Sequence, residues 1–226
     1  MAGWGEFVLA YAAFLLSHVI PTRPAIRDPA AAVLGQRGFT LAYSLLSVVL
    51  LTWLIVAAGR APYVGLWDHA VWQRWAVNLA MPVALALVVF GLGAPNPLSF
   101  GGRAAGFDPD RPGIAGVARH PLLWALLLWA SAHMIANGDL AHVLLFGGFA
   151  LFSAMGMRMI DRRKRRRMPD WAQLAARTSA FPFAALMTGR WRPRGGPSVW
   201  RLAVWLAVWL ALLWLHLPVI GADPLP

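Results

Sequence analysis

The sequence predicts an all-α fold, a polytopic integral membrane bundle of about six transmembrane helices that forms one domain over residues 1–226. Three observations predict this class. The chain is 59% hydrophobic and 13% charged, whereas soluble domains average about 25% charged residues. Apolar stretches near the length of about 20 residues that spans a bilayer recur along the chain. Proline and glycine stand at the ends of these stretches.

The six predicted spans are residues 3–21, 39–58, 74–93, 120–137, 139–160 and 199–220. Pro21 ends the first span and Gly59 the second. The segment 93–113 is rich in glycine and proline and is expected to be a loop. Asn137-Gly138-Asp139 predicts a tight turn that makes the fourth and fifth spans a hairpin.

The basic residues predict the orientation in the membrane. Eighteen of the 20 Lys and Arg residues lie in the connections on one side of the six predicted spans. Twelve of them fall between Arg158 and Arg201, and RRKRRR occupies 162–167. Because basic loops stay in the cytoplasm, both termini are expected outside and 161–198 is expected to be a cytoplasmic loop. This placement of charge indicates anionic lipid headgroups at 162–167 as the partner, and it argues against nucleic acid.

The chain contains no cysteine. Disulfides, thiolate metal sites and cysteine nucleophiles are therefore excluded, and a metal has to be held by histidine, carboxylate or methionine. The first span has no basic leader before it and no small-residue cleavage site after it, so we expect it to be retained.

Histidines inside apolar spans are the first candidates for a functional site, because ionisable groups are costly there. His18 follows Ser17 in the first span, and His133 is surrounded by small residues in the fourth. A neutral imidazole donates from one nitrogen and offers the other to a metal. Two such groups facing each other can hold a haem iron. The alternative is a histidine bonded to a carbonyl of a neighbouring helix.

Arg119-His120-Pro121 is a second candidate, at the cytoplasmic start of the fourth span. Proline favours the first helical turn, and arginine prefers carboxylate or phosphate partners. The motif is either a helix start with an interfacial arginine or an anchor for a polar cofactor edge. His120 and His133 are separated by roughly 20 Å along a helix and roughly 140° around it, so they cannot ligate one atom.

Five stretches carry a resemblance to a known family. They are SHVIPTRPAIR (17–27), GQRGFTLAYSLLS (35–47), GRAPYVGLWD (59–68), the run that begins RHPLLWALLLWASAHMIANGD (119–139) and RTSAFPFAALMTGR (177–190). Together they resemble the NnrU family of bacterial membrane proteins. The resemblance implies a protein of the bacterial inner membrane linked to nitrite or nitric oxide metabolism.

Two relatives of that family imply chemistry. The 15-cis-zeta-carotene isomerases carry haem b, and their proposed ligands correspond here to His18 and His133, which implies redox-gated isomerisation of a lipophilic substrate. The isoprenylcysteine carboxyl methyltransferases share Arg-His-Pro. They imply S-adenosylmethionine at Arg119 and His120, with the segment around Thr178, as the alternative. Leu122-Leu123 departs from the Tyr and Gly of their motif.

The expected depths of the histidines in the membrane do not decide which two of them form a pair. His18 is expected near the cytoplasmic end of its span and His133 near the outer end of its own. By depth alone His18 pairs with His120, and His133 pairs with His142 or His216. A third reading is non-enzymatic: an assembly or regulatory partner of a respiratory or nitrogen-oxide reductase, docked through the basic loop.

Overall fold

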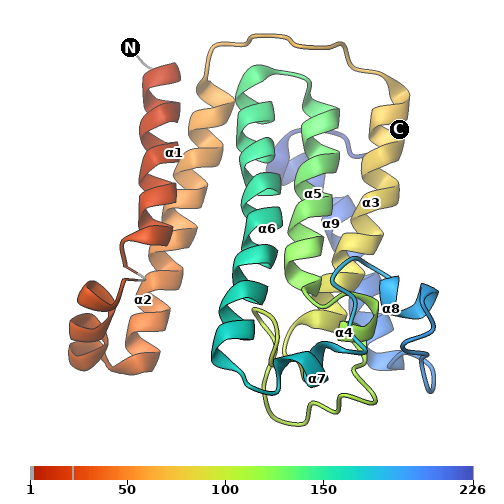
Figure 1. Ribbon diagram of the computed structural model, residues 1–226. Helices are drawn as coiled ribbons and strands as arrows, with labels where there is room; N and C mark the ends of the chain where they lie inside the picture. Colours follow the sequence, from red (N-terminus) through yellow and green to blue (C-terminus); the bar gives the residue numbers. More distant parts are fainter. Residues whose placement is uncertain (1–2, 22, 226) are drawn as a thin grey trace. The chain divides into compact units, whose positions relative to one another are not determined.

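The computed structural model describes residues 3–21 and 23–225, and the regular structure within them is α-helical. The nine helices of these residues are α1 (Trp4–Val19), α2 (Pro24–Arg60), α3 (Val71–Gly91), α4 (Ile114–Val117), α5 (Pro121–Asn137), α6 (Leu140–Arg167), α7 (Trp171–Ala175), α8 (Ala184–Met187) and α9 (Val199–Ile220). The predicted all-helical class is confirmed (Figure 1).

A helix overlaps each of the six predicted spans, namely α1, α2, α3, α5, α6 and α9. Within the described residues, four of these helices are long and apolar enough to cross a bilayer: α2, α3, α6 and α9. Helices α1 and α5 are apolar but shorter, with 16 and 17 residues. The count of six spans and the outside position of the termini stay predictions.

Two helices extend far beyond their predicted bounds, and α3 begins three residues before its predicted span. α2 begins at Pro24 and bends at Gly35, where φ is 72° and ψ is 160°. Residues with a side chain rarely adopt this conformation, so glycine permits the bend. Figure 1 shows the part before Gly35 as a separate helical segment, and the predicted span 39–58 lies after it. α6 continues to Arg167, so the basic run 162–167 is helical, and α7 and α8 occupy part of the predicted loop 161–198.

The chain divides into two compact units. The first extends to Asp68 and includes Gly138–Leu145, and in it α1 packs along α2. The carboxylate of Glu6 in α1 accepts from Trp53 Nε1 at 3.3 Å and lies 3.7 Å from Arg60 Nη1. The acidic side chain in the apolar helix α1 is therefore partnered within its own unit.

The second unit comprises His69–Asn137 and the chain from Phe146 onward. Helix α3 packs against α5 and α9, around a core of small and aliphatic side chains that includes Ala84, Leu87 and Ala125. The indole N–H of Trp205 in α9 donates to the Pro82 carbonyl of α3 at 2.8 Å. Every residue of α9 keeps some exposure, as expected of a helix that faces lipid.

Candidate functional site

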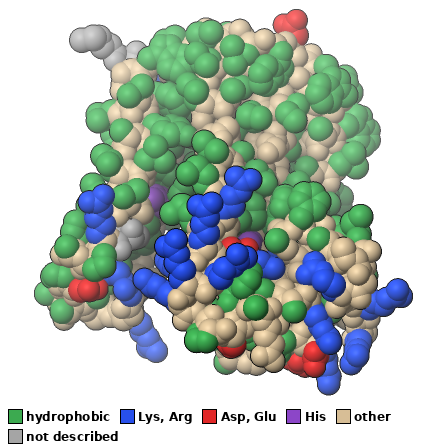
Figure 2. All heavy atoms as spheres, viewed as in Figure 1, with side chains coloured by type: hydrophobic (Ala, Val, Ile, Leu, Met, Phe, Trp, Pro, Cys, Tyr) green, Lys and Arg blue, Asp and Glu red, His purple; other side chains and the backbone are tan. Residues whose placement is uncertain are grey.

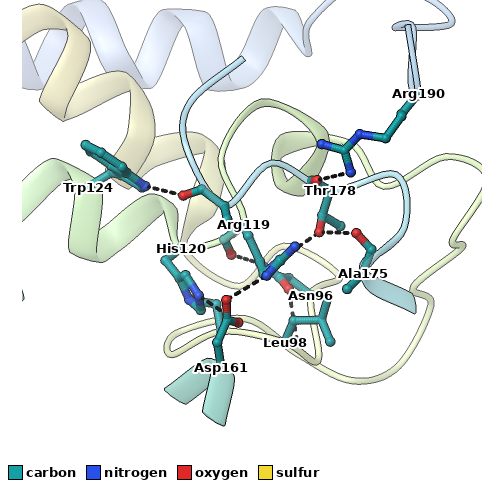
Figure 3. A network of polar contacts seen from close by, with 11 residues as sticks. Asn96, Leu98, Arg119, His120, Trp124, Asp161, Ala175, Thr178 and Arg190 are labelled. Carbon is teal, nitrogen blue, oxygen red and sulfur yellow. Dashed lines mark hydrogen bonds and ion pairs between the residues drawn. The ribbon is translucent and has the colours of Figure 1, made fainter. Parts of the chain in front are cut away.

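Arg119 and His120 lie in a buried polar network where α5 begins (Figure 3). They retain only 6% and 1% exposure. Arg119 Nη1 donates to Asp161 Oδ2 at 2.6 Å, and its Nε donates to Thr178 Oγ1 at 2.8 Å. The other oxygen of Asp161 lies 3.1 Å from His120 Nε2. One carboxylate near the end of α6 therefore holds both side chains of the motif.

Both ring nitrogens of His120 are engaged. Because the Asp161 carboxylate accepts, Nε2 carries the proton. Nδ1 then accepts from the hydroxyl of Ser99, at 3.0 Å. The His120 ring links the loop between α3 and α4 to α6.

Backbone groups complete the network. Asn96 Nδ2 donates to the Arg119 carbonyl at 2.8 Å, and the Arg119 N–H donates to the Ser179 carbonyl at 2.7 Å. The Thr178 hydroxyl donates to the Ala175 carbonyl at 2.8 Å. Buried polar groups are costly unless bonded, and here they are bonded to one another. The beginning of α5 is thereby fixed to the loop before it, to α6 and to the chain after α7.

Charge is concentrated around this network. Burial lowers the pKa of Arg119, while the Asp161 carboxylate raises it, and Arg190 and Arg165 lower it further. A guanidinium stays protonated in proteins, so the pair is ionic. The Trp171 ring faces two guanidiniums, with Arg119 Cζ at 5.3 Å and Arg165 Cζ at 4.5 Å from its centroid. Such cation–π contacts offset part of the repulsion between neighbouring arginines.

The carboxylate partner expected for Arg119 is a residue of the same chain, Asp161. Sequence reasoning missed Asp161, Asn96 and Ser99. Asp161 had a signal, because it is the single carboxylate directly before the basic run 162–167. No sequence signal pointed to Asn96 or Ser99, because they lie in the segment 93–113, whose glycines and prolines predicted only a loop.

His133 lies further along α5 in a different setting. Its Nδ1 is 2.8 Å from the Trp129 carbonyl, which can only accept, so Nδ1 carries the proton. The ring centroids of Trp129 and Phe146 are 5.3 and 5.4 Å away. The lone pair therefore sits on Nε2. A metal-ligating histidine donates its other nitrogen to a carbonyl or carboxylate in the same way.

His18 repeats this arrangement in the first unit. Its Nδ1 lies 2.8 Å from the Phe14 carbonyl, four residues earlier on α1. The ring centroids of Phe14 and Tyr43 are 4.4 and 6.0 Å from that of His18, and the Ser17 hydroxyl is 3.2 Å from its Nδ1. Both histidines predicted as haem ligands are half-buried and anchored through Nδ1 to a carbonyl one turn back.

The other histidines differ. His142 Nδ1 bonds Asp139 Oδ2 at 2.7 Å at the start of α6, and the exposed His69 lies 3.0 Å from the Ala136 carbonyl. His216 Nδ1 donates to the Ala222 carbonyl at 2.8 Å, and this histidine belongs to the same unit as His133. Among the described residues, no group of three or more histidines and carboxylates is arranged to hold a metal.

The long apolar helices indicate a multi-pass membrane protein, and its apolar helices α1 and α5 each carry a histidine bonded to a carbonyl one turn back. A family model described as NnrU protein matches residues 6–224, and the chain belongs to this family. The predicted family is thus confirmed.

A curated relative adds one similarity. The chain is 28% identical over 173 residues to the chloroplastic 15-cis-zeta-carotene isomerase of Arabidopsis thaliana. The match covers 73% of this chain and 46% of that protein, so the chain spans about half of the relative's length. No solved structure matches the chain.

Proposed function

We propose that this chain is a haem b protein of the bacterial inner membrane that takes part in isomerising a lipophilic substrate, with His18 and His133, each within its own unit, as candidate iron ligands. The isomerase part draws on the similarity to the zeta-carotene isomerase. The haem part of the proposal rests on the shared geometry of the two imidazoles. Each of them donates Nδ1–H to the carbonyl four residues before it.

The donor set fits haem iron. In His133, anchoring Nδ1 fixes the tautomer in which Nε2 holds the lone pair, which is the form that binds a metal. The aromatic neighbours of His133 favour a neutral ring and provide apolar contact for a flat macrocycle. When bound, haem supplies an iron centre whose ligation responds to its oxidation state.

The other residues of the site have a supporting role in this proposal. The Asp161 network fixes where α5 begins, and α5 carries His133. The helices α3, α5 and α9 present apolar surfaces, which suit a substrate that enters from the bilayer. Because the chain offers no cysteine, imidazole is its strongest nitrogen or sulfur ligand for iron.

The test is the absorption spectrum of protein purified from cells with ample porphyrin supply. The wild type is expected to show a Soret band, and His18→Ala and His133→Ala are each expected to abolish or strongly weaken it. His69→Ala is the matched control, because this histidine is exposed and lies in a loop. A colourless wild type, or a full band in His133→Ala, overturns the proposal.

His216 provides the competing pair within the second unit. Its Nδ1 is also bonded to a carbonyl, and it lies in the same unit as His133. Loss of the band in His216→Ala together with retention in His18→Ala would reassign the second ligand to His216. The reverse result supports the pair implied by the relative.

The methyltransferase alternative has less support from this geometry. Arg119 and His120 are already bonded to Asp161, Thr178 and Ser99. S-adenosylmethionine would have to displace these partners and leave a buried charge behind. We therefore expect calorimetry in detergent to detect no binding of this cofactor.

We also infer that the basic run 162–167 contacts anionic lipid headgroups. Its five arginines are exposed, and Figure 2 shows Lys and Arg side chains gathered on one part of the visible surface. Basic residues close to a membrane surface attract anionic lipids by about 1 kcal/mol each. Replacing the five arginines with glutamine should lower the amount of anionic lipid that copurifies with the protein, measured by mass spectrometry.

A further inference from the structure

A short stretch outside the long apolar helices exposes large apolar side chains. In the 181–187 segment, which ends with α8, Phe181 is 67% exposed, Phe183 50%, Leu186 40% and Met187 82%. Scattered apolar residues on a surface are ordinary, but four within seven residues form a contiguous stretch that calls for a partner.

These side chains cannot turn inward, because the backbone of the segment is clamped. The Ser179 hydroxyl donates to the Gly116 carbonyl at 2.5 Å and accepts from the Ala185 N–H at 2.8 Å. The Phe183 N–H donates to the Val117 carbonyl at 2.7 Å. Ala185 is the fully buried side chain of the segment. The small residue faces the protein, and the large ones face away.

The far end of the segment is held as well. Trp191 is buried, and a Cβ at Gly116 would lie 2.6 Å from its ring. The glycine therefore lets α4 and Trp191 approach closely, just beyond α8. The exposed side chains between Ser179 and Trp191 belong to a rigid surface.

Phe183 shows that this orientation is maintained at a cost. Its φ is 64° and its ψ is −1°, which is the left-handed region that a bulky side chain disfavours by roughly 1–2 kcal/mol. It is the one residue other than glycine with positive φ in the described chain. Backbone strain of this kind persists where the surroundings hold it, and it often accompanies a functional surface.

The surroundings of the segment indicate what covers it. Phe181 meets Trp124 edge-on at 5.3 Å, and the Trp124 indole donates to the Ala180 carbonyl at 3.1 Å. Trp124 lies in the first turn of the apolar helix α5, and tryptophan favours the headgroup zone of a bilayer. Residues 177–194 contain four arginines and no carboxylate. Apolar side chains flanked by cations are typical of elements that lie in the interface of an anionic membrane.

We propose that the 181–187 segment inserts into the boundary between headgroups and acyl chains of an anionic bilayer, at the end of the second unit where α5 begins. The apolar side chains enter the acyl boundary, and arginines such as Arg190 and Arg192 remain at the phosphate level. The segment thereby anchors the network around Arg119 to the membrane surface. This inference does not depend on haem.

The absence of cysteine makes the test direct, because each substitution introduces a unique thiol. Phe183→Cys and Met187→Cys are labelled with a nitroxide in nanodiscs that contain anionic lipid. Collision rates with oxygen, which partitions into lipid, and with a water-soluble nickel chelate report the environment. The oxygen-to-nickel ratio is expected to be several-fold higher than at Asp170→Cys, an exposed position between α6 and α7, and to approach that of Leu206→Cys on the lipid-facing α9.

A ratio equal to that at Asp170 places the segment in water and overturns the proposal. Protection from both reagents also overturns it, because a protein partner or a second copy would then cover the segment. Replacing the anionic lipid with a zwitterionic one should reduce the ratio at Met187 and leave that at Leu206 unchanged. Phe183→Gly relieves the left-handed strain, so this variant is expected to fold. A lower oxygen-to-nickel ratio at Met187 in this variant therefore reports loss of insertion and not loss of folding.

Discussion

His120 and His133 belong to the same unit and stand thirteen residues apart, yet their rings are used in opposite ways. His120 is fully buried, and both of its nitrogens are engaged, with Asp161 and Ser99. His133 is half-buried and donates Nδ1–H to a carbonyl of its own helix, which leaves the lone pair on Nε2. The first ring joins segments of the chain, whereas the second is held through one nitrogen to its own helix.

The difference distinguishes two kinds of histidine bonding in an apolar chain. By burial alone, His120 would be the stronger candidate for a ligand site than His133, because it is among the least exposed polar side chains. The bonding of each ring nitrogen reverses that ranking. A ring with two satisfied nitrogens has no capacity left for a ligand, while a ring fixed through one nitrogen presents the other.

Asp161→Ala is expected to have the largest effect on stability. It leaves the buried Arg119 without its carboxylate and removes the partner of His120 Nε2. Removing one member of a buried ion pair typically costs about 3–5 kcal/mol. Asp161 keeps 22% exposure, so the value should fall toward the lower end. Thermal unfolding in detergent, followed by circular dichroism, measures the loss.

Asp170→Ala is the control for this change, because the Asp170 side chain is exposed and makes no capping bond to α7. Its unfolding midpoint should match that of the wild type. If Asp161→Ala unfolds at the same temperature as Asp170→Ala, the network does not stabilise the second unit. That result would contradict the structural role of His120.

His120→Phe is expected to have the next largest effect. A flat ring is kept, one atom larger than imidazole, but the Ser99 hydroxyl and one oxygen of Asp161 lose their partner. An unsatisfied buried polar group costs about 1–3 kcal/mol, so a loss of about 2 kcal/mol is expected. The absorption band of the folded fraction should remain, because this ring has no nitrogen to offer. Loss of the band from protein that is still folded would contradict the structural role.

The contrast also shows what the sequence can predict. Hydrophobic stretches located the six long helices, and Pro121 located the start of α5, because both follow from local chemistry. The pairing of Arg119 with Asp161 depends on bringing together residues 42 positions apart. Local patterns carry no information about that distance.

The bounds of α2 and α6 were harder to predict for different reasons. Gly35 allows two helical segments to follow each other at a bend, so the segment before it looked like a connection. Charged residues favour helices as readily as loops, so the run 162–167 ended the predicted span while the helix continued to Arg167. The tautomers of His18 and His133 could not be predicted, because they depend on the ring rotamer and not on spacing.

Ser99→Ala tests the outer edge of the network and should have a smaller effect. It removes one neutral hydrogen bond to His120 Nδ1, and an intramolecular bond of this kind contributes about 1 kcal/mol. Ser99 is only partly buried, so water can replace part of the bond. The unfolding midpoint is expected to fall slightly, between those of the wild type and His120→Phe. A fall as large as that of Asp161→Ala would show that Ser99 carries more of the network than its single bond implies.

His133→Phe is expected to have the smallest effect on stability and the clearest effect on the spectrum. The Trp129 carbonyl still accepts the backbone N–H of residue 133 within α5, so no polar group is left unpartnered. The new ring is slightly larger than imidazole and packs among Trp129 and Phe146, and because the site is partly exposed the cost should stay under about 1.5 kcal/mol. The Soret band should be absent, and the unfolding midpoint should match that of haem-free wild type, because bound haem itself stabilises the folded state. Destabilisation comparable to His120→Phe, with the band retained, would mean that the two rings have the same structural role and that the lone pair on Nε2 binds no iron.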